Sequence, residues 1–164
     1  MASTTKYFLT ILAYYILFCI FGIMLFSVFD ALRGAPALGG GPSGLIPFLA
    51  TWVAATMMTG HAYPGRAARE EIRTKNKEIS IYFALTQFVI SAVFLIFASP
   101  IPDILINAAI VIICTVIGYA LCYYAIKNSL KVAEKNMARF RESIEKEKDP
   151  EKKKKMEENL KKYD

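Results

Sequence analysis

The chain has 164 residues, of which 55% are hydrophobic and 21% charged, and its formal net charge is +6. The charge is segregated, because residues 127–164 contain 13 basic and 9 acidic side chains whereas residues 7–29 contain none. This segregation is not typical of a soluble domain and favours an all-α membrane protein with a charged extension. The basic residues flank apolar segments, so we expect anionic lipid headgroups, and no nucleic acid, to be their partner.

Cysteine and histidine are sparse, which limits the chemistry to be expected. Cys19, Cys114 and Cys122 all lie inside apolar segments, no two cysteines form a Cys-x-x-Cys pair, and His61 is the only histidine. Free cysteines in apolar helices usually act as small packing residues. We therefore predict no metal site, no cofactor and no catalytic residue.

Residues 7–29 are the first predicted transmembrane helix, since about 20 apolar residues cross the hydrocarbon core. The run is longer than the roughly 7–15 residues of a signal-peptide core, so we expect it to be retained. Tyr14 and Tyr15 lie in its middle, where a hydroxyl group needs a partner, and should face other helices. Residues 30–44 hold five of the nine glycines and two prolines, and this composition predicts an irregular segment.

Residues 45–60 are the shortest predicted transmembrane helix. Small residues at close spacing predict that other helices approach this segment closely. These residues are Ala50, Ala54, Ala55 and Thr56. The apolar run of about 15 residues is short for a full crossing, so a buried or re-entrant helix is the alternative.

Residues 79–97 and 104–126 are the third and fourth predicted transmembrane helices, joined by a proline-marked turn at 99–103. Gln87 lies near the middle of the third and Asn107 near the start of the fourth. A side-chain amide in hydrocarbon must find a partner. The two residues either form hydrogen bonds between helices or, together with Tyr14 and Tyr15, line a transport pathway.

The polar loop of residues 61–78 carries five basic and three acidic residues, and from Arg66 it predicts an amphipathic helix. Two pairs on it have favourable helical spacing, Glu70 with Arg73 and Glu71 with Lys75. The candidate functional side chains of this loop are His61, Arg66, Arg69 and Glu71. They indicate either contact with lipid headgroups or, as the alternative, the site of a membrane-embedded lipid-modifying enzyme.

The tail, residues 127–164, continues without glycine or proline as far as Pro150, so we expect the fourth helix to extend into it. Asp149 and Pro150 are typical of an N-cap followed by the first residue of a helix, which predicts a helical hairpin with its turn at 149–150. Apolar residues three and four apart form a stripe along the tail. This tail stripe consists of Leu130, Ala133, Met137, Phe140 and Ile144. It predicts packing on a partner protein, on a second copy, or on the returning helix.

The positive-inside rule orients the predicted helices. With both termini in the cytoplasm, 19 of the 20 lysines and arginines lie inside and only Arg33 lies outside. The opposite orientation would place the basic loop and the tail outside the cell. We therefore predict a multi-pass protein of the cytoplasmic (inner) membrane with cytoplasmic N- and C-termini.

Residues 7–126 also carry a recognisable pattern. Glycines and a serine, GGGPSG, precede the small residues of ATWVAATMMTG, and Gly65, Arg66 and Glu71 follow as G-R-x-x-x-x-E. This pattern resembles a family of small bacterial inner-membrane proteins with four predicted helices and no known function. The resemblance implies a bacterial inner membrane and four transmembrane helices, and it implies no activity.

Three functions are consistent with these features. The small-residue faces, the tail stripe and the lack of catalytic motifs favour a non-catalytic accessory or assembly subunit, within a homo-oligomer or a larger complex, whose tail binds a cytoplasmic partner protein. An oligomeric small channel or transporter lined by Gln87 and Asn107 is the first alternative. A lipid-modifying enzyme that uses the loop residues is the second.

Overall fold

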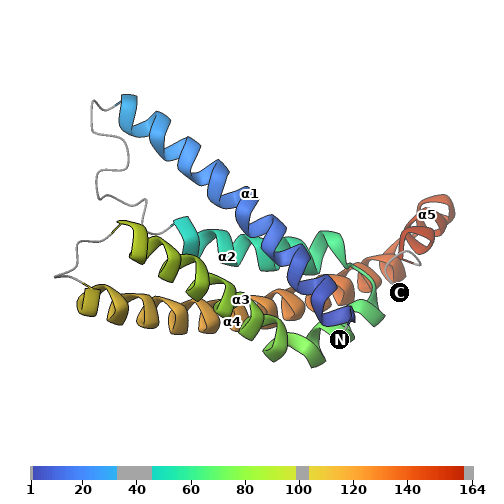
Figure 1. Cartoon of the computed structure of the whole chain (residues 1–164). Helices are drawn as coiled ribbons and strands as arrows, with labels where there is room; N and C mark the ends of the chain where they lie inside the picture. Colours follow the sequence, from blue (N-terminus) through green and yellow to red (C-terminus); the bar gives the residue numbers. More distant parts are fainter. Residues whose placement is uncertain (1, 33–45, 99–103, 161–164) are drawn as a thin grey trace.

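The computed structural model describes residues 2–32, 46–98 and 104–160, and Figure 1 shows that they form helices. The elements are α1 (Ala2–Leu32), α2 (Ile46–Met57), the short π-helix η2 (Met58–Ala62), α3 (Arg66–Ala98), α4 (Ile104–Lys146) and α5 (Pro150–Leu160). The described residues include no strand, which confirms the all-α class. The predicted turn at 99–103 lies outside the described residues, as does the predicted irregular segment 30–44 after its first three residues, which belong to α1.

Two of the described helices are long and apolar enough to cross a membrane. They contain the segments Thr4–Leu25 in α1 and Leu105–Lys146 in α4, in which an 18-residue stretch has a mean hydropathy of 2.5 and 2.4, respectively. These segments indicate a membrane protein. The predicted crossings at 45–60 and 79–97 are not among them. With 12 residues, α2 is about 18 Å long against a hydrocarbon core of about 30 Å. The side chains of residues 94–98, at the end of α3, lie outside the described part of the structure.

The buried core lies towards one end of the bundle, where the N-terminal part of α1 meets α3 (Figure 1). Its central residues come from the three long helices and from η2. They are Ile11 on α1, Met58 on η2, Phe83 on α3 and Ile126 on α4. Away from this end, large apolar side chains of α1, α3 and α4 are exposed. Exposed apolar surface of this extent is expected of helices that face lipid.

The buried face of α2 is made of small residues, as the sequence predicted. Ala50, Ala54 and Ala55 are buried, and this allows α2 to pack closely on α1 and α4. Thr56 was expected on the same face but is exposed, and its hydroxyl donates to the Trp52 carbonyl. Thr51 is buried instead, because residues 50, 51, 54 and 55 fall on one side of a helix and residue 56 does not.

Polar side chains cross-link the helices at the core end of the bundle. The Tyr7 hydroxyl of α1 donates to Glu71 of α3 at 2.6 Å, and the hydroxyls of Thr59 and Ser129 share a hydrogen bond between η2 and α4. The amide nitrogen of Asn76 on α3 donates to the backbone carbonyl of Tyr123 on α4 at 3.1 Å. Buried polar groups need such partners, and here the partners also hold neighbouring helices in register.

Replacing Asn76 with alanine should therefore loosen α3 from α4. The substitution also removes the Asn76 side-chain oxygen that accepts from the buried Ser80 hydroxyl at 3.3 Å. We therefore expect the free energy of unfolding to fall by about 2 kcal/mol, the worth of two hydrogen bonds. Denaturation of the purified protein in detergent measures this loss. Asn136→Ala is the matched control, because Asn136 is exposed on the same helix as Tyr123. Equal losses in the two variants would contradict the assignment.

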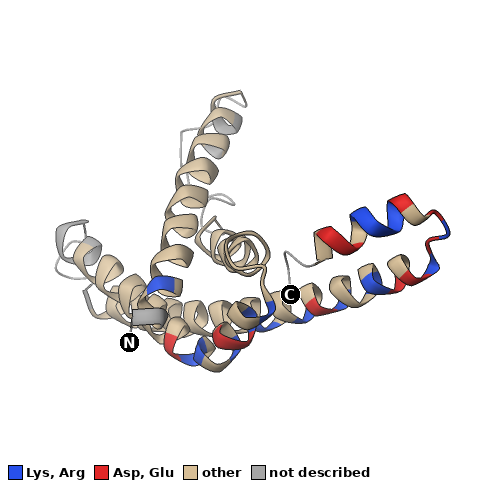
Figure 2. Ribbon diagram, turned by 90° about the vertical axis from the view of Figure 1, so that its right-hand side faces the viewer, with Lys and Arg blue, Asp and Glu red and all other residues tan. Residues whose placement is uncertain are grey.

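The tail extends α4 beyond the bundle and then turns back (Figure 2). From Ile104, α4 runs as one helix to Lys146, and α5 starts at Pro150. The Asp149 side chain accepts hydrogen bonds from the backbone N–H groups of Glu151 and Lys152 at 3.0 and 3.4 Å, which makes it the N-cap of α5. Figure 2 shows that charged residues gather at the core end of the bundle and along the tail.

Candidate functional site

A cavity of about 270 Å³ lies between the helices of the apolar part of the molecule. The amide of Gln87 donates to the Tyr15 hydroxyl at 3.4 Å, which joins α3 to α1. Ser91 and Thr115 add hydroxyl groups from α3 and α4. The full lining is Tyr15, Pro47, Phe48, Gln87, Ile90, Ser91, Cys114 and Thr115. Two of the polar residues predicted to lie within the membrane thus face one cavity.

The other two residues of that set lie elsewhere. Tyr14 is half-buried and packs against the core, but it does not line the cavity. Asn107 is half-buried near the start of α4, and it does not line the cavity that Gln87 faces. The structure therefore brings Gln87 and Tyr15 together and separates Asn107 and Tyr14 from them.

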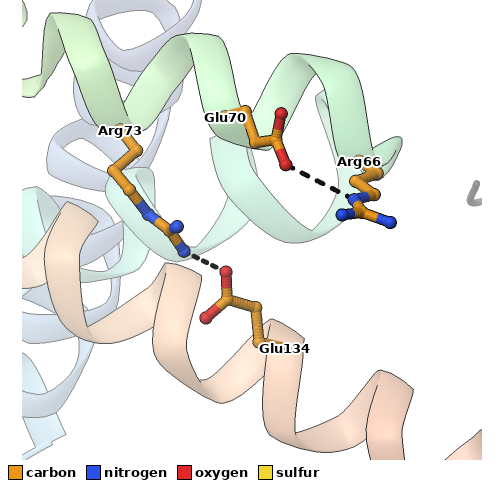
Figure 3. A network of polar contacts seen from close by, with 4 residues as sticks. All are labelled: Arg66, Glu70, Arg73 and Glu134. Carbon is orange, nitrogen blue, oxygen red and sulfur yellow. Dashed lines mark hydrogen bonds and ion pairs between the residues drawn. The ribbon is translucent and has the colours of Figure 1, made fainter.

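The polar loop does not form one cluster. His61 is exposed on η2, and within the described residues no hydrogen bond or ion pair joins it to another side chain. Glu71 accepts the Tyr7 hydrogen bond and lies 3.4 Å from the Lys75 ammonium, the pair that helical spacing predicted. Glu70 instead pairs with Arg66 at 3.3 Å, and the expected pairing partner Arg73 reaches across to Glu134 of α4 (Figure 3).

Arginines of α3 and α4 surround a pocket of about 350 Å³, which we call the arginine pocket. It is lined by Arg66, Arg69, Glu70, Arg73, Glu134, Met137, Ala138 and Arg141. On α3 the four charged residues follow the spacing i, i+3, i+4 and i+7, which places them on one face of the helix. Figure 3 shows that the ion pair between Arg73 and Glu134 bridges the two helices that form the pocket.

The tail stripe is buried at its two ends and half-buried between them. Leu130 belongs to the core, and Ile144 is buried where α5 returns along the end of α4 (Figure 2). Ala133, Met137 and Phe140 keep part of their surface exposed, and Met137 also lines the arginine pocket. The two ends of the tail stripe are thus covered within the chain itself. The middle of the stripe stays partly exposed.

Several residues of these sites had not been singled out from the sequence. On the tail side of the arginine pocket they are Glu134 and Arg141, and in the cavity they are Ser91 and Thr115. The helical spacing of Arg66, Arg69 and Arg73 is visible in the sequence and marks one half of the pocket. The other half depends on where α4 packs, which no local pattern reports.

Comparison offers no relative from which a role could be transferred. No model of a protein family matches the chain, and neither a curated protein nor a solved structure matches it. Among the described residues, no group of three histidine, cysteine or acidic side chains is arranged to hold a metal ion. The likeness to a family of four-helix bacterial membrane proteins stays a prediction.

Proposed function

We propose that the chain is a non-catalytic accessory or assembly subunit of a membrane complex, and that its tail binds a cytoplasmic protein. The observation that carries the proposal is the continuity of α4, which runs for 43 residues from an apolar segment into the charged tail. A partner bound to the tail would be tied by one rigid element to the helices in the membrane.

The proposed topology has four crossings and both termini in the cytoplasm, in a bacterial inner membrane. It is supported by the collection of charged residues at the core end and along the tail, opposite the exposed apolar surfaces (Figure 2). The positive-inside rule assigns that end to the cytoplasm. In this topology the short helix α2 crosses with the help of residues that precede it.

The proposed contact centres on the middle of the tail stripe. Phe140 and Met137 are half-buried apolar residues surrounded by charged ones such as Arg139 and Glu142. An aromatic anchor within a polar rim is the usual composition of an interface hot spot. Because basic residues outnumber acidic ones along the tail, the partner should present an acidic surface beside its apolar pocket.

Photo-crosslinking in living cells tests this contact. A photoreactive phenylalanine analogue at position 140 should give one discrete adduct that contains a second protein, and the same analogue at the exposed neighbouring position 139 should not. The double variant Met137→Asp/Phe140→Asp, probed from position 133 on the half-buried part of the stripe, should remove the adduct. Val132→Asp places the same charge on an exposed apolar position outside the stripe and should leave the adduct intact.

Three results would decide against this proposal. They are no adduct from position 140, equal adducts from positions 139 and 140, or an adduct that survives the double substitution. An adduct of two copies of the 18.4 kDa chain would replace the separate partner by self-association.

An oligomeric channel or transporter is the second candidate, favoured by the cavity that Gln87 and Tyr15 share. If the cavity belongs to a conduction pathway, Gln87→Leu should strongly reduce flux of a small ion or solute from proteoliposomes, since it removes the only side-chain amide among the described residues of the lining. Thr86→Val, a substitution one residue away on α3 that lies outside this cavity, is the control. Equal flux from all three proteins, or no flux from the wild type, would reject this candidate.

A further inference from the structure

Arg69 is the only charged residue that is buried in the described part of the structure. Only 9% of its surface is exposed, although its neighbours in the arginine pocket, Arg66 and Arg73, are exposed. Guanidinium groups remain charged in proteins, and a buried charge is normally paired with an acid or strongly hydrogen-bonded. Within the described part of the chain, the Arg69 side chain has neither kind of partner, and no side-chain nitrogen there is both fully buried and unbonded, so its guanidinium group reaches the solvent of the pocket.

The carboxylates of the pocket are directed to other arginines. Glu70 pairs with Arg66, and Glu134 pairs with Arg73 across the two helices (Figure 3). Four arginines against two glutamates leave the lining positively charged. Both acidic side chains of the lining are thus engaged by other arginines, and Arg69 faces a pocket of about 350 Å³.

From these observations we infer that the arginine pocket binds a phosphate-bearing anion, with Arg69 as its principal ligand. Phosphate suits the site because the guanidinium fork donates two parallel hydrogen bonds to a pair of phosphate oxygens. Arg141 faces the same pocket from α4 and would supply a second cation. The bound anion would thereby join the start of α3 to the tail.

The position of the pocket along the helices indicates the source of the phosphate. Arg69 precedes Ile79, the start of the predicted crossing, by ten residues, or about 15 Å of helix. The headgroup layer on each side of a bilayer is only about 5–8 Å deep. Arg69 would therefore lie on the water side of the headgroup layer, where a soluble phosphate compound has free access. The phosphate of a lipid would reach it only on a long headgroup.

Thermal melting of the purified full-length chain in neutral detergent tests the inference. Pyrophosphate is titrated at an ionic strength held constant with sodium chloride, so that general salt effects cancel. We expect the melting temperature of the wild type to rise with pyrophosphate. Arg69→Gln should weaken the apparent affinity by about tenfold or more. Arg139→Gln, an exposed arginine of the tail outside the pocket, should respond as the wild type does.

Arg69→Gln should also melt close to the wild-type temperature when no anion is present, because the Arg69 guanidinium group makes no hydrogen bond or ion pair within the described fold. If that variant does not fold, Arg141→Gln takes its place, since its side chain lines the pocket from an exposed position. We expect it to weaken the apparent affinity severalfold.

A second arm distinguishes a soluble ligand from a lipid. The same proteins are melted in micelles doped with phosphatidic acid, which carries a phosphate monoester, or with phosphatidylcholine. Stabilisation by phosphatidic acid alone, lost in Arg69→Gln, would support the phosphate site and assign it to a lipid. The inference is overturned if neither probe stabilises the wild type, or if the pocket variants and Arg139→Gln respond equally.

Discussion

Phe83→Ala should lower the free energy of unfolding by about 3 kcal/mol, the largest loss that we expect from a single substitution in this chain. The Phe83 side chain is fully buried, and its ring lies edge-on to that of Tyr15, with the centroids 5.0 Å apart and the planes at 88°. Removing the ring leaves a void where α1 meets α3 and forfeits packing that water or lipid cannot replace. Unfolding titrated with a denaturing detergent measures the loss.

Phe88→Ala is the matched control for this experiment. Phe88 lies on the same helix with 39% of its surface exposed, so its truncation opens no internal void. We expect a change within about 0.5 kcal/mol, as for most surface positions. A loss in Phe88→Ala as large as that in Phe83→Ala would show that the core does not lie where we place it.

Gly118→Ala should be destabilising by about 1–2 kcal/mol, although alanine is the better helix former. A Cβ atom on Gly118 would overlap the Gln87 side-chain oxygen and would lie 3.2 Å from the amide carbon. Gln87 would have to turn away, and its hydrogen bond to Tyr15 would break. Melting of the variant in detergent measures the effect.

Two further variants separate this contact from a general effect of replacing a helical glycine with alanine. At Gly60 a Cβ atom would meet no other atom within 4 Å, so Gly60→Ala should cause no loss. In a Gln87→Ala background the obstruction is gone, and Gly118→Ala should become neutral or stabilising. If Gly118→Ala costs the same in both backgrounds, the two residues are not coupled.

The helices follow from features that are local in the sequence. Apolar runs and the distribution of charge predict where α1 and α4 lie, and Asp149 with Pro150 predicts the start of α5. The sequence also predicted an amphipathic helix from Arg66, separate from a transmembrane helix at 79–97. The structure joins the two into α3, because no glycine or proline between them interrupts the backbone hydrogen bonds.

The sites are less accessible to sequence reasoning, because they depend on how the helices rotate against one another. Tyr7 bonds to Glu71, and Arg73 pairs with Glu134, across separations of 64 and 61 residues. Helical spacing identified the Glu71–Lys75 pair but gave Arg73 the wrong partner, since it contains no information about α4. The burial of Arg69 could not be predicted for the same reason. The sequence shows which face of α3 carries Arg69, but it does not show which other helices pack near that face.

The unbroken course of α4 has a mechanical consequence. Its 43 residues form a rod about 65 Å long. A tilt of about 10°, well within the range of helices in bilayers, swings one end of such a rod sideways by about 11 Å relative to the other. Local thinning of the membrane, which tilts helices that are too long for it, is thereby converted into a displacement of the charged end that is larger than the change in thickness itself.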